Sequence, residues 1–360
     1  MLAEFTERGA SVFKPTTIRV YLLRALDSGF NPDQILEGSG VSWSDIDALK
    51  PLELDKIAEL FGYLARRTPP DFAMTCGDAI SIRDFGIVGF TMMSMPTLRD
   101  AFQCWTRYAL LAGHPLISTI TEEGDEWCMN FVPRRLMSSE SLRFCMEVSI
   151  AGLEPVIPEM TEIPANTLRI DFPFDRPLST DRYDLFRTRN VQFGRACGAY
   201  FGKRSDLDRP IRSSDGLVSD IIHQECDKSL SELTNARSIR DRLEDLMMVS
   251  AGTMPSLDEM ANALRLSRRS LQRELSQENL SYQQLVKEFR MKQAMVLLGE
   301  KRTNIKTIAY LLGYKDTGSF RRAFQEWTGL SIGQWQASQE QRAATGKRVS
   351  MQAENTLHIN

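Results

Sequence analysis

Histidine is scarce in this sequence, and its cysteines are not paired. The 360 residues contain three histidines, His114, His223 and His358, and six cysteines that form no C-x-x-C pair. A zinc site needs clustered ligands of these types, and a disulfide framework needs a regular cysteine pattern. We therefore expect no metal, no cofactor and reduced cysteines in a cytoplasmic protein.

Long apolar runs and a signal-like start are also lacking. The chain opens with MLAEFTERGA, which has no basic segment followed by an apolar one. No apolar run approaches the ~18 residues that span a bilayer. The sequence also shows no phosphate loop, metal-binding helix or nucleophile beside a base. We expect neither export nor membrane insertion, and we predict no catalytic residue and no enzyme.

The composition is that of an ordinary globular protein with an uneven charge distribution. Hydrophobic residues make up 42% and charged residues 25% of the chain, and its length predicts two domains. The net charge is −3, yet residues 252–340 carry 13 Lys and Arg against 9 Asp and Glu. Such asymmetry is typical of a basic module that binds nucleic acid and is attached to a more acidic domain.

The first part of the chain mixes helical and strand-like patterns. Helical periodicity occurs at residues 18–26 and 55–65, and alternation occurs on both sides of Glu123-Gly124-Asp125, which predicts a hairpin turn. Further strands are predicted at 167–172 and 191–193. Residues 14–202 are therefore expected to form an α+β regulatory domain.

Three more segments follow. We expect residues 203–251 to form a linker with one or two helices, because a polar, Pro-containing boundary precedes a helical pattern. Residues 252–340 are helical in pattern throughout and predict an all-α domain. Residues 341–360 lack apolar periodicity and are expected to form a disordered tail.

A short unit occurs twice in the all-α domain, at an offset of 48 residues. Met260–Leu266 matches Ile308–Tyr314, and Leu271–Leu275 matches Phe320–Phe324 one residue further apart. Each copy predicts two short helices joined by a tight turn, which is a helix-turn-helix unit. The pattern at 282–298 predicts one joining helix, roughly 25 Å long. Two recognition helices so joined can reach successive major grooves of DNA.

The second helix of each unit leaves hydrogen-bond donors on its outer face. We predict Ser256 with Glu259, Ser267 and Asp316 as N-caps. The outward side chains suit base edges and phosphates, and we predict them as DNA-binding residues: Arg268, Arg269, Gln272 and Arg273 in the first unit, and Lys315, Thr317, Ser319, Arg321 and Arg322 in the second. The alternative interpretation is that these side chains are only solvated on the outer face of a helix, and it is strongest for Arg268.

Residues 256–338 resemble the DNA-binding module of the AraC/XylS family of bacterial transcription regulators. The resemblance rests on LDEMANALRLSRRSLQREL, FRMKQAMVLL and IKTIAYLLGYKDTGSFRRAFQEWTGLS. It implies double-stranded DNA as the main partner, with a second copy of the chain and RNA polymerase as further partners. Three departures stand out: Leu275 replaces a usual Phe, Gly318 replaces a common Ser, and the closing signature lacks its Pro and Arg.

The first domain resembles the arabinose-binding-like regulatory domain of the subgroup that includes ornithine-utilisation regulators. The matching stretches are FGIVGFTMMSMPTLRDAF, EEGDEW and LDRPIRSSDG. The resemblance implies effector binding or dimerisation. From a set that also contains Arg107 and His114, we name five candidate effector-binding residues: Arg83, Trp105, Tyr108, Trp127 and Arg134. Core packing or solvation accounts for such single residues more often than ligand binding does.

Three functions follow from these patterns. The first is a sequence-specific, DNA-binding transcription regulator whose first domain responds to a small molecule. The second keeps DNA binding but makes the first domain a platform for dimerisation or protein interaction, with no metabolite ligand. The third is an enzyme or repair protein fused to the DNA-binding module, and the absence of a thiolate cluster argues against it. The sequence leaves the effector, the operator and the direction of regulation open.

Overall fold

The computed structural model describes residues 12–135, 137–162, 164–177, 181–250, 254–299 and 305–338. The chain divides into two compact units, Met1–Val249 and Ser250–Asn360. The tail expected at 341–360 lies outside the described residues. Within the described ranges, no helix has both the length and the apolar character needed to cross a membrane.

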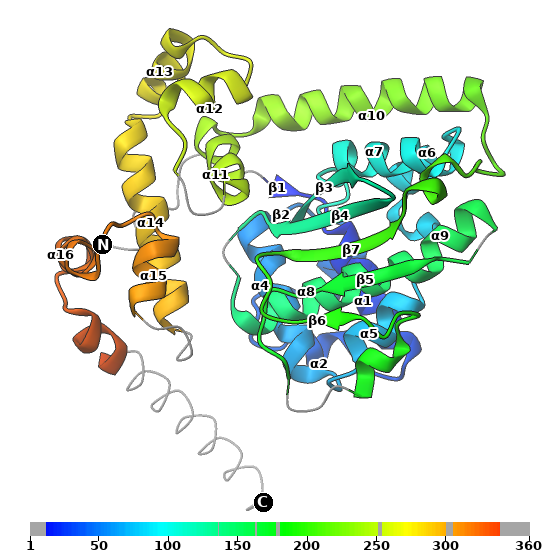
Figure 1. Cartoon of the computed structure of the whole chain (residues 1–360), viewed down its shortest axis with the longest axis horizontal. Coiled ribbons are helices and arrows are strands. Elements are labelled where there is room, and N and C mark those ends of the chain that lie inside the picture. Colours follow the sequence, from blue (N-terminus) through cyan, green and yellow to red (C-terminus); the bar gives the residue numbers. More distant parts are fainter. Residues whose placement is uncertain are drawn as a thin grey trace, which may run out of the picture. The chain divides into compact units, whose positions relative to one another are not determined.

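The first unit is an α+β domain, as the sequence predicts (Figure 1). Its strands are β1 (Val12–Phe13), β2 (Leu52–Glu53), β3 (Leu116–Glu123), β4 (Glu126–Pro133), β5 (Thr167–Asp171), β6 (Val191–Gln192) and β7 (Gly198–Lys203). Its α-helices are α1 (Thr16–Asp27), α2 (Pro32–Leu36), α3 (Trp43–Asp47), α4 (Leu54–Arg67), α5 (Phe72–Asp78), α6 (Ile87–Ser94), α7 (Leu98–Tyr108), α8 (Ser139–Ala151), α9 (Leu153–Thr161), α10 (Gly216–Ala236) and α11 (Ile239–Val249). Short 3₁₀ helices are η2 (Ile82–Phe85), η3 (Asp181–Leu185) and η4 (Arg204–Asp208).

A five-stranded sheet with the order β3-β4-β7-β5-β6 forms the centre of this unit. Strands β3 and β4 are antiparallel, with Glu123 opposite Glu126, so the predicted hairpin turn is confirmed. Gly124 takes a positive φ of 58° in that turn, a conformation that glycine adopts at little cost. Strand β7 is antiparallel to both of its neighbours, and β5 pairs with β6 in parallel.

Strand β7 lies in the middle of the sheet, although no strand was predicted there. Its sequence GAYFGK contains two glycines and no clear alternation, which hides a strand from pattern analysis. Packing requires the glycine at 202, beside a rigid ring, and at 198 a larger residue would force a flexible methionine to move. A Cβ at Gly198 would lie 2.6 Å from Sδ of Met146, and one at Gly202 would lie 2.6 Å from the Trp127 ring.

Helix α11, at the end of the first unit, is held by a buried group of ion pairs. Asp245 accepts hydrogen bonds from Arg134 at 3.2 Å, from Arg135 at 2.7 Å and from Arg237 at 2.9 Å. Arg135 also contacts Asp241 at 2.8 Å. The helices expected at 203–251 are thus present as α10 and α11, and both are grouped with the first unit, which ends at Val249.

The second unit is all-α among the residues that the structure describes. It contains α12 (Leu257–Ala263), α13 (Arg268–Gln277), α14 (Tyr282–Gly299), α15 (Ile305–Leu311) and α16 (Thr317–Thr328), with a last helical segment at 332–338. Helices α12 and α13 form the first helix-turn-helix unit, and α15 and α16 form the second. The long helix α14 joins them in the chain, so the predicted fold class is confirmed (Figure 1).

The ion pairs of α11 generate a stability prediction. Asp245→Ala leaves three guanidinium groups without their shared carboxylate, and removing one partner of a buried pair typically costs about 3–5 kcal/mol. We expect a loss of this order in the free energy of unfolding of the first unit, measured by urea denaturation of the full chain. The control is Glu140→Ala, which removes a solvent-exposed pair with Arg66 and should cost at most about 1 kcal/mol. Equal losses for the two variants would refute the prediction.

Candidate nucleic-acid interface

The two helix-turn-helix units share the same turn geometry. In the first turn the amide of Leu266 donates to the carbonyl of Ala261 at 2.9 Å, and in the second Tyr314 donates to Ala309 at 2.9 Å. The residue before each donor has a positive φ, 56° at Arg265 and 76° at Gly313. The repeat found in the sequence is therefore a repeat of backbone conformation.

Helices α12, α13 and α16 begin with the side-chain caps that the sequence predicts. Ser256 and Glu259 form a capping box at the start of α12. Ser267 caps α13, and Asp316 caps α16 by accepting from the amide of Ser319 at 2.7 Å. The hydrogen bonds from Ser319 lower the pKa of Asp316, which keeps this cap charged near neutral pH.

One face of each recognition helix is buried against its own unit. Leu271 and Leu275 of α13 are buried, as are Phe320 and Phe324 of α16. The two phenylalanines belong to a core cluster that also contains residues of α14 and α15. Burial of these positions fixes which side chains face outward, because positions three and four apart share a helix face.

The predicted DNA-binding residues of α13 lie on its outer face. Arg269, Gln272 and Arg273 are exposed, and their side chains have no hydrogen bond or ion pair with the residues described here. Arg268 differs from them, because its Nη1 contacts Oδ2 of Asp258 on α12 at 2.7 Å. Arg268 therefore connects the two helices of the first helix-turn-helix unit through an exposed ion pair.

The second set of predicted residues surrounds the start of α16. Lys315, Arg321 and Arg322 are exposed, whereas Thr317 and Ser319 are half-buried. The hydroxyl of Ser319 donates to Asp316 at 2.8 Å and accepts from Nη2 of Arg322 at 3.2 Å. The structure thus brings Ser319 and Arg322 together at the cap, which positions the Arg322 guanidinium beside the amino end of the helix.

Helix α14 connects to both helix-turn-helix units through side chains. Its 18 residues correspond to roughly 27 Å of helix. At its start the hydroxyl of Tyr282 donates to the carbonyl of Pro255, just before α12. Further along, Nζ of Lys287 lies 2.7 Å from Oε1 of Glu326 on α16. Through these contacts α14 is held against both helix-turn-helix units.

A side-chain cap takes the place of the proline that the closing signature lacks in this chain. The last helical segment begins after Ser331, whose amide donates to Oε1 of Gln334 at 2.9 Å. The amide of Gln334 donates back to the Ser331 hydroxyl at 3.3 Å. This reciprocal pair caps the helix without the proline that the signature usually carries.

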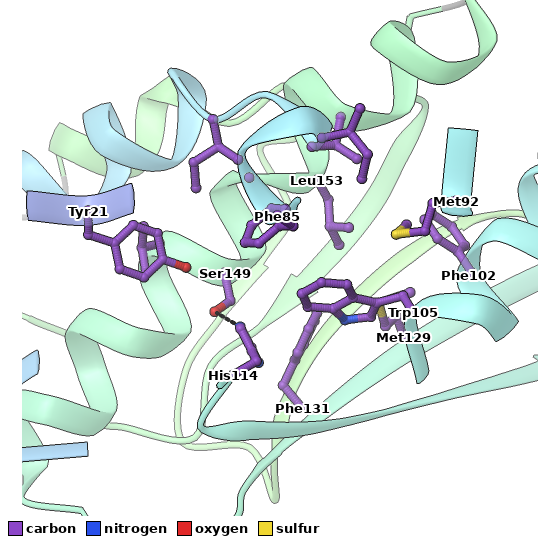
Figure 2. A pocket seen from close by; sticks show the side chains of 15 residues that line it. Tyr21, Phe85, Met92, Phe102, Trp105, His114, Met129, Phe131, Ser149 and Leu153 are labelled. Atoms are coloured by element: carbon purple, nitrogen blue, oxygen red, sulfur yellow. Dashed lines mark hydrogen bonds between the residues drawn. The ribbon is translucent and has the colours of Figure 1, made fainter. Parts of the chain in front are cut away.

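The candidate effector-binding residues of the first unit do not gather in one place. Trp105 lines a cavity of about 50 Å³ within this unit (Figure 2). The side chain of Arg83 is exposed, and the hydroxyl of Tyr108 donates to Asp227 of α10 at 2.5 Å. Trp127 packs in the core between Phe102 and Tyr200. Arg134 belongs to the ion pairs of α11.

The cavity also contains residues that the sequence did not single out. Its polar side chains besides Trp105 are Tyr21, His114 and Ser149. His114 belonged to the wider sequence set, but Tyr21 and Ser149 come from helices α1 and α8 and carry no local signal of a pocket. Their meeting at one cavity depends on how the helices pack.

Comparison with known proteins gives matches for both units. The model of the "Arabinose-binding domain of AraC transcription regulator, N-term" matches residues 29–211, and a helix-turn-helix domain model matches residues 260–338. The chain is 25% identical over 336 residues to the uncharacterized HTH-type transcriptional regulator Rv1395 of Mycobacterium tuberculosis, covering 88% of this chain and 96% of the relative. It is 25% identical over 260 residues to the ornithine utilization regulator of Pseudomonas aeruginosa, covering 72% and 76%.

A solved structure is also similar. The transcriptional regulator CdpR from Pseudomonas aeruginosa is 19% identical, and the match covers 89% of this chain and 98% of that chain with a TM-score of 0.48. The names of the two sequence relatives describe an HTH-type transcriptional regulator and a regulator of ornithine utilization.

The shared turn geometry generates a prediction about Arg265. An ordinary side chain in the left-handed conformation costs about 1–2 kcal/mol, whereas glycine adopts it freely, as Gly313 does in the second turn. Arg265→Gly should therefore stabilise the second unit by roughly 1 kcal/mol, measured by chemical denaturation of the full chain. Arg265→Ala is the matched control and keeps the strain. A Gly variant no more stable than the Ala variant would contradict the argument.

Proposed function

The chain belongs to the AraC family of transcription regulators, and on that premise we propose that each chain reads two successive major grooves of its operator. We further propose that a small molecule bound in the first unit modulates this DNA binding. Helix α13 provides one set of contacts and α16 the other. The relatives' names support regulation of transcription in general terms, and the finer proposal depends on the chemistry of the two exposed helix faces.

The observation that carries this proposal is that exposed hydrogen-bond donors recur at equivalent positions of the two helix-turn-helix units, where Gln272 matches Arg321 and Arg273 matches Arg322. Arg269 and Arg273 on α13, and Arg321 on α16, have exposed guanidinium groups without partners among the described residues. An arginine fork suits the O6 and N7 acceptors of guanine, and the amide of Gln272 suits adenine. The capped amino ends of the helices favour nearby phosphates.

Loss of one base-reading arginine should reduce sequence-specific binding. We expect Arg273→Ala and Arg322→Ala each to cost about 1–3 kcal/mol in binding to operator DNA and much less on random DNA. The measurement is fluorescence anisotropy on both DNAs at several salt concentrations. Arg189→Ala is the control, because that exposed arginine lies in the first unit and outside the candidate effector-binding set.

The pattern of losses on the two DNAs shows whether each arginine contacts a base or only phosphate. Equal, small losses on operator and random DNA would show that the arginine contacts only phosphate. No loss on either DNA would contradict the role of that helix.

An exposed apolar patch on the first unit supports a homodimer. Nine large hydrophobic side chains are exposed among the described residues, and five of them lie on two packed helices, α6 and α10. These five, which we name the α6–α10 patch, are Ile87, Phe90, Leu217, Val218 and Ile221. Because a two-fold axis pairs one patch with its own copy, these apolar side chains would meet an identical apolar set across the axis. We propose a second copy of this chain as its occupant.

The same patch is the specific observation in favour of the second candidate function, in which the first unit only dimerises. The two candidates differ in whether a ligand acts on DNA binding. They share the dimer.

Charge placed in the α6–α10 patch should separate the dimer. Leu217 is 79% exposed and Ile221 is 69% exposed, so Leu217→Glu with Ile221→Glu should fold normally and sediment as a monomer. The control is Leu185→Glu, because Leu185 is also exposed, at 58%, but lies in η3 outside the patch. Analytical ultracentrifugation of the full chain gives the result. A charged-patch variant that stays dimeric would place the dimer interface elsewhere.

A further inference from the structure

The cavity in the first unit has an apolar wall and a small polar end. It is lined by fifteen residues from several helices and strands, and none of them carries a carboxylate, ammonium or guanidinium group. Phe85, Met92 and Phe131 are among the apolar members, and Figure 2 shows the Tyr21 hydroxyl directed toward Ser149. A charged ligand or a sugar would lose its hydration here without enough polar partners to replace it.

His114 forms the polar end of the cavity. Its Nε2 lies 3.2 Å from the Ser149 hydroxyl, and its Nδ1 lies 3.3 Å from the backbone of Leu116. Burial lowers the pKa of His114 to about 4, so the imidazole is neutral at neutral pH. The Trp105 ring packs edge-on against it, with 5.2 Å between the ring centroids. The end of the cavity is therefore lined by neutral hydrogen-bonding groups, which are bonded to one another and to the backbone.

The backbone of His114 leads away from the cavity to α11. The carbonyl of His114 accepts from Nε of Arg134 at 3.3 Å, and Nη1 of Arg134 contacts Asp245 at 3.2 Å. Asp245 lies in α11, whose last residue, Val249, directly precedes the second unit in the chain. One arginine thus connects the wall of the cavity to the helix that leads into the DNA-binding unit.

Resting on the effector control proposed above, we propose that this cavity binds a small, uncharged and largely apolar ligand with one hydroxyl or carbonyl group. The ligand acts through His114 and Arg134 on helix α11. At about 50 Å³ the cavity is smaller than the ~150 Å³ that holds a benzene ring in an engineered protein. Entry of a ligand must therefore displace the lining. Met92 and Met129 are flexible enough to yield, and His114 shares the same wall.

Ligand binding can be tested with phenol as the probe, because phenol has one ring and one hydroxyl. The full chain is labelled with ¹⁵N in its histidine rings, and His114→Gln assigns the His114 signals among the three histidines. We expect saturable shifts of His114 with phenol and none with arabinose. Val148→Ile adds one methylene to the cavity wall and should weaken phenol binding roughly fivefold or more. Val20→Ile, buried but outside the cavity, should not.

The connection to α11 is tested by hydrogen exchange of residues 239–249 in the full chain. We expect phenol to change this exchange in the wild type. Arg134→Gln should keep the His114 shift and lose the effect on α11. Arg135→Gln is the matched control and keeps the effect, because Arg135 pairs with Asp241 and Asp245 but not with His114. If Arg134→Gln does not fold, Arg134→Lys keeps the charge but lacks the planar fork that bonds both partners.

The outcomes separate the two proposals. No saturable His114 shift with phenol, or equal binding by Val148→Ile and Val20→Ile, would overturn the ligand site. An exchange effect that persists without the Arg134 fork would overturn its connection to α11. Operator binding is measured without phenol, so a failure of sequence-specific DNA binding would refute the proposed function and leave the His114 result intact.

Discussion

Burial of one face of each recognition helix is the constraint on which the DNA-binding assignment depends. Leu271 and Leu275 fix the rotation of α13 about its axis, and Phe320 and Phe324 fix that of α16. Short helices are marginal on their own, so these contacts supply most of their stability. The arginines on the opposite faces are then presented to solvent in a defined order. A change in the buried set would alter the exposed set as well.

The first unit uses charge in a different way. Asp245 is shared by three buried or nearly buried guanidinium groups, and it lies on the last helix before the DNA-binding unit. Such a group tolerates little displacement, because each arginine depends on the same carboxylate. Arg134 also contacts the carbonyl of His114 at the cavity wall. The helix that leads into the second unit is therefore connected to the interior of the first.

Local patterns were sufficient for much of the fold and for the DNA-binding face. The hairpin at Gly124, the caps at Ser267 and Asp316 and the repeated turn follow from short-range rules, and the structure confirms them. Strand β7 was not predicted, because its two glycines pack against Met146 and Trp127, which are distant in sequence. The cavity was equally hidden. Tyr21, His114 and Ser149 meet through tertiary packing, and Arg134 is buried by helix α11, which no local pattern places against it.

Hydroxyl-radical footprinting of the full chain on its operator tests the central claim most directly. Two recognition helices per chain predict two protected patches in each half-site, separated by about one helical turn of 10–10.5 base pairs. Protection of both patches should remain when the α6–α10 patch is charged, because one chain carries both helices. A single protected patch per chain would contradict the account, since it would leave either α13 or α16 without a groove.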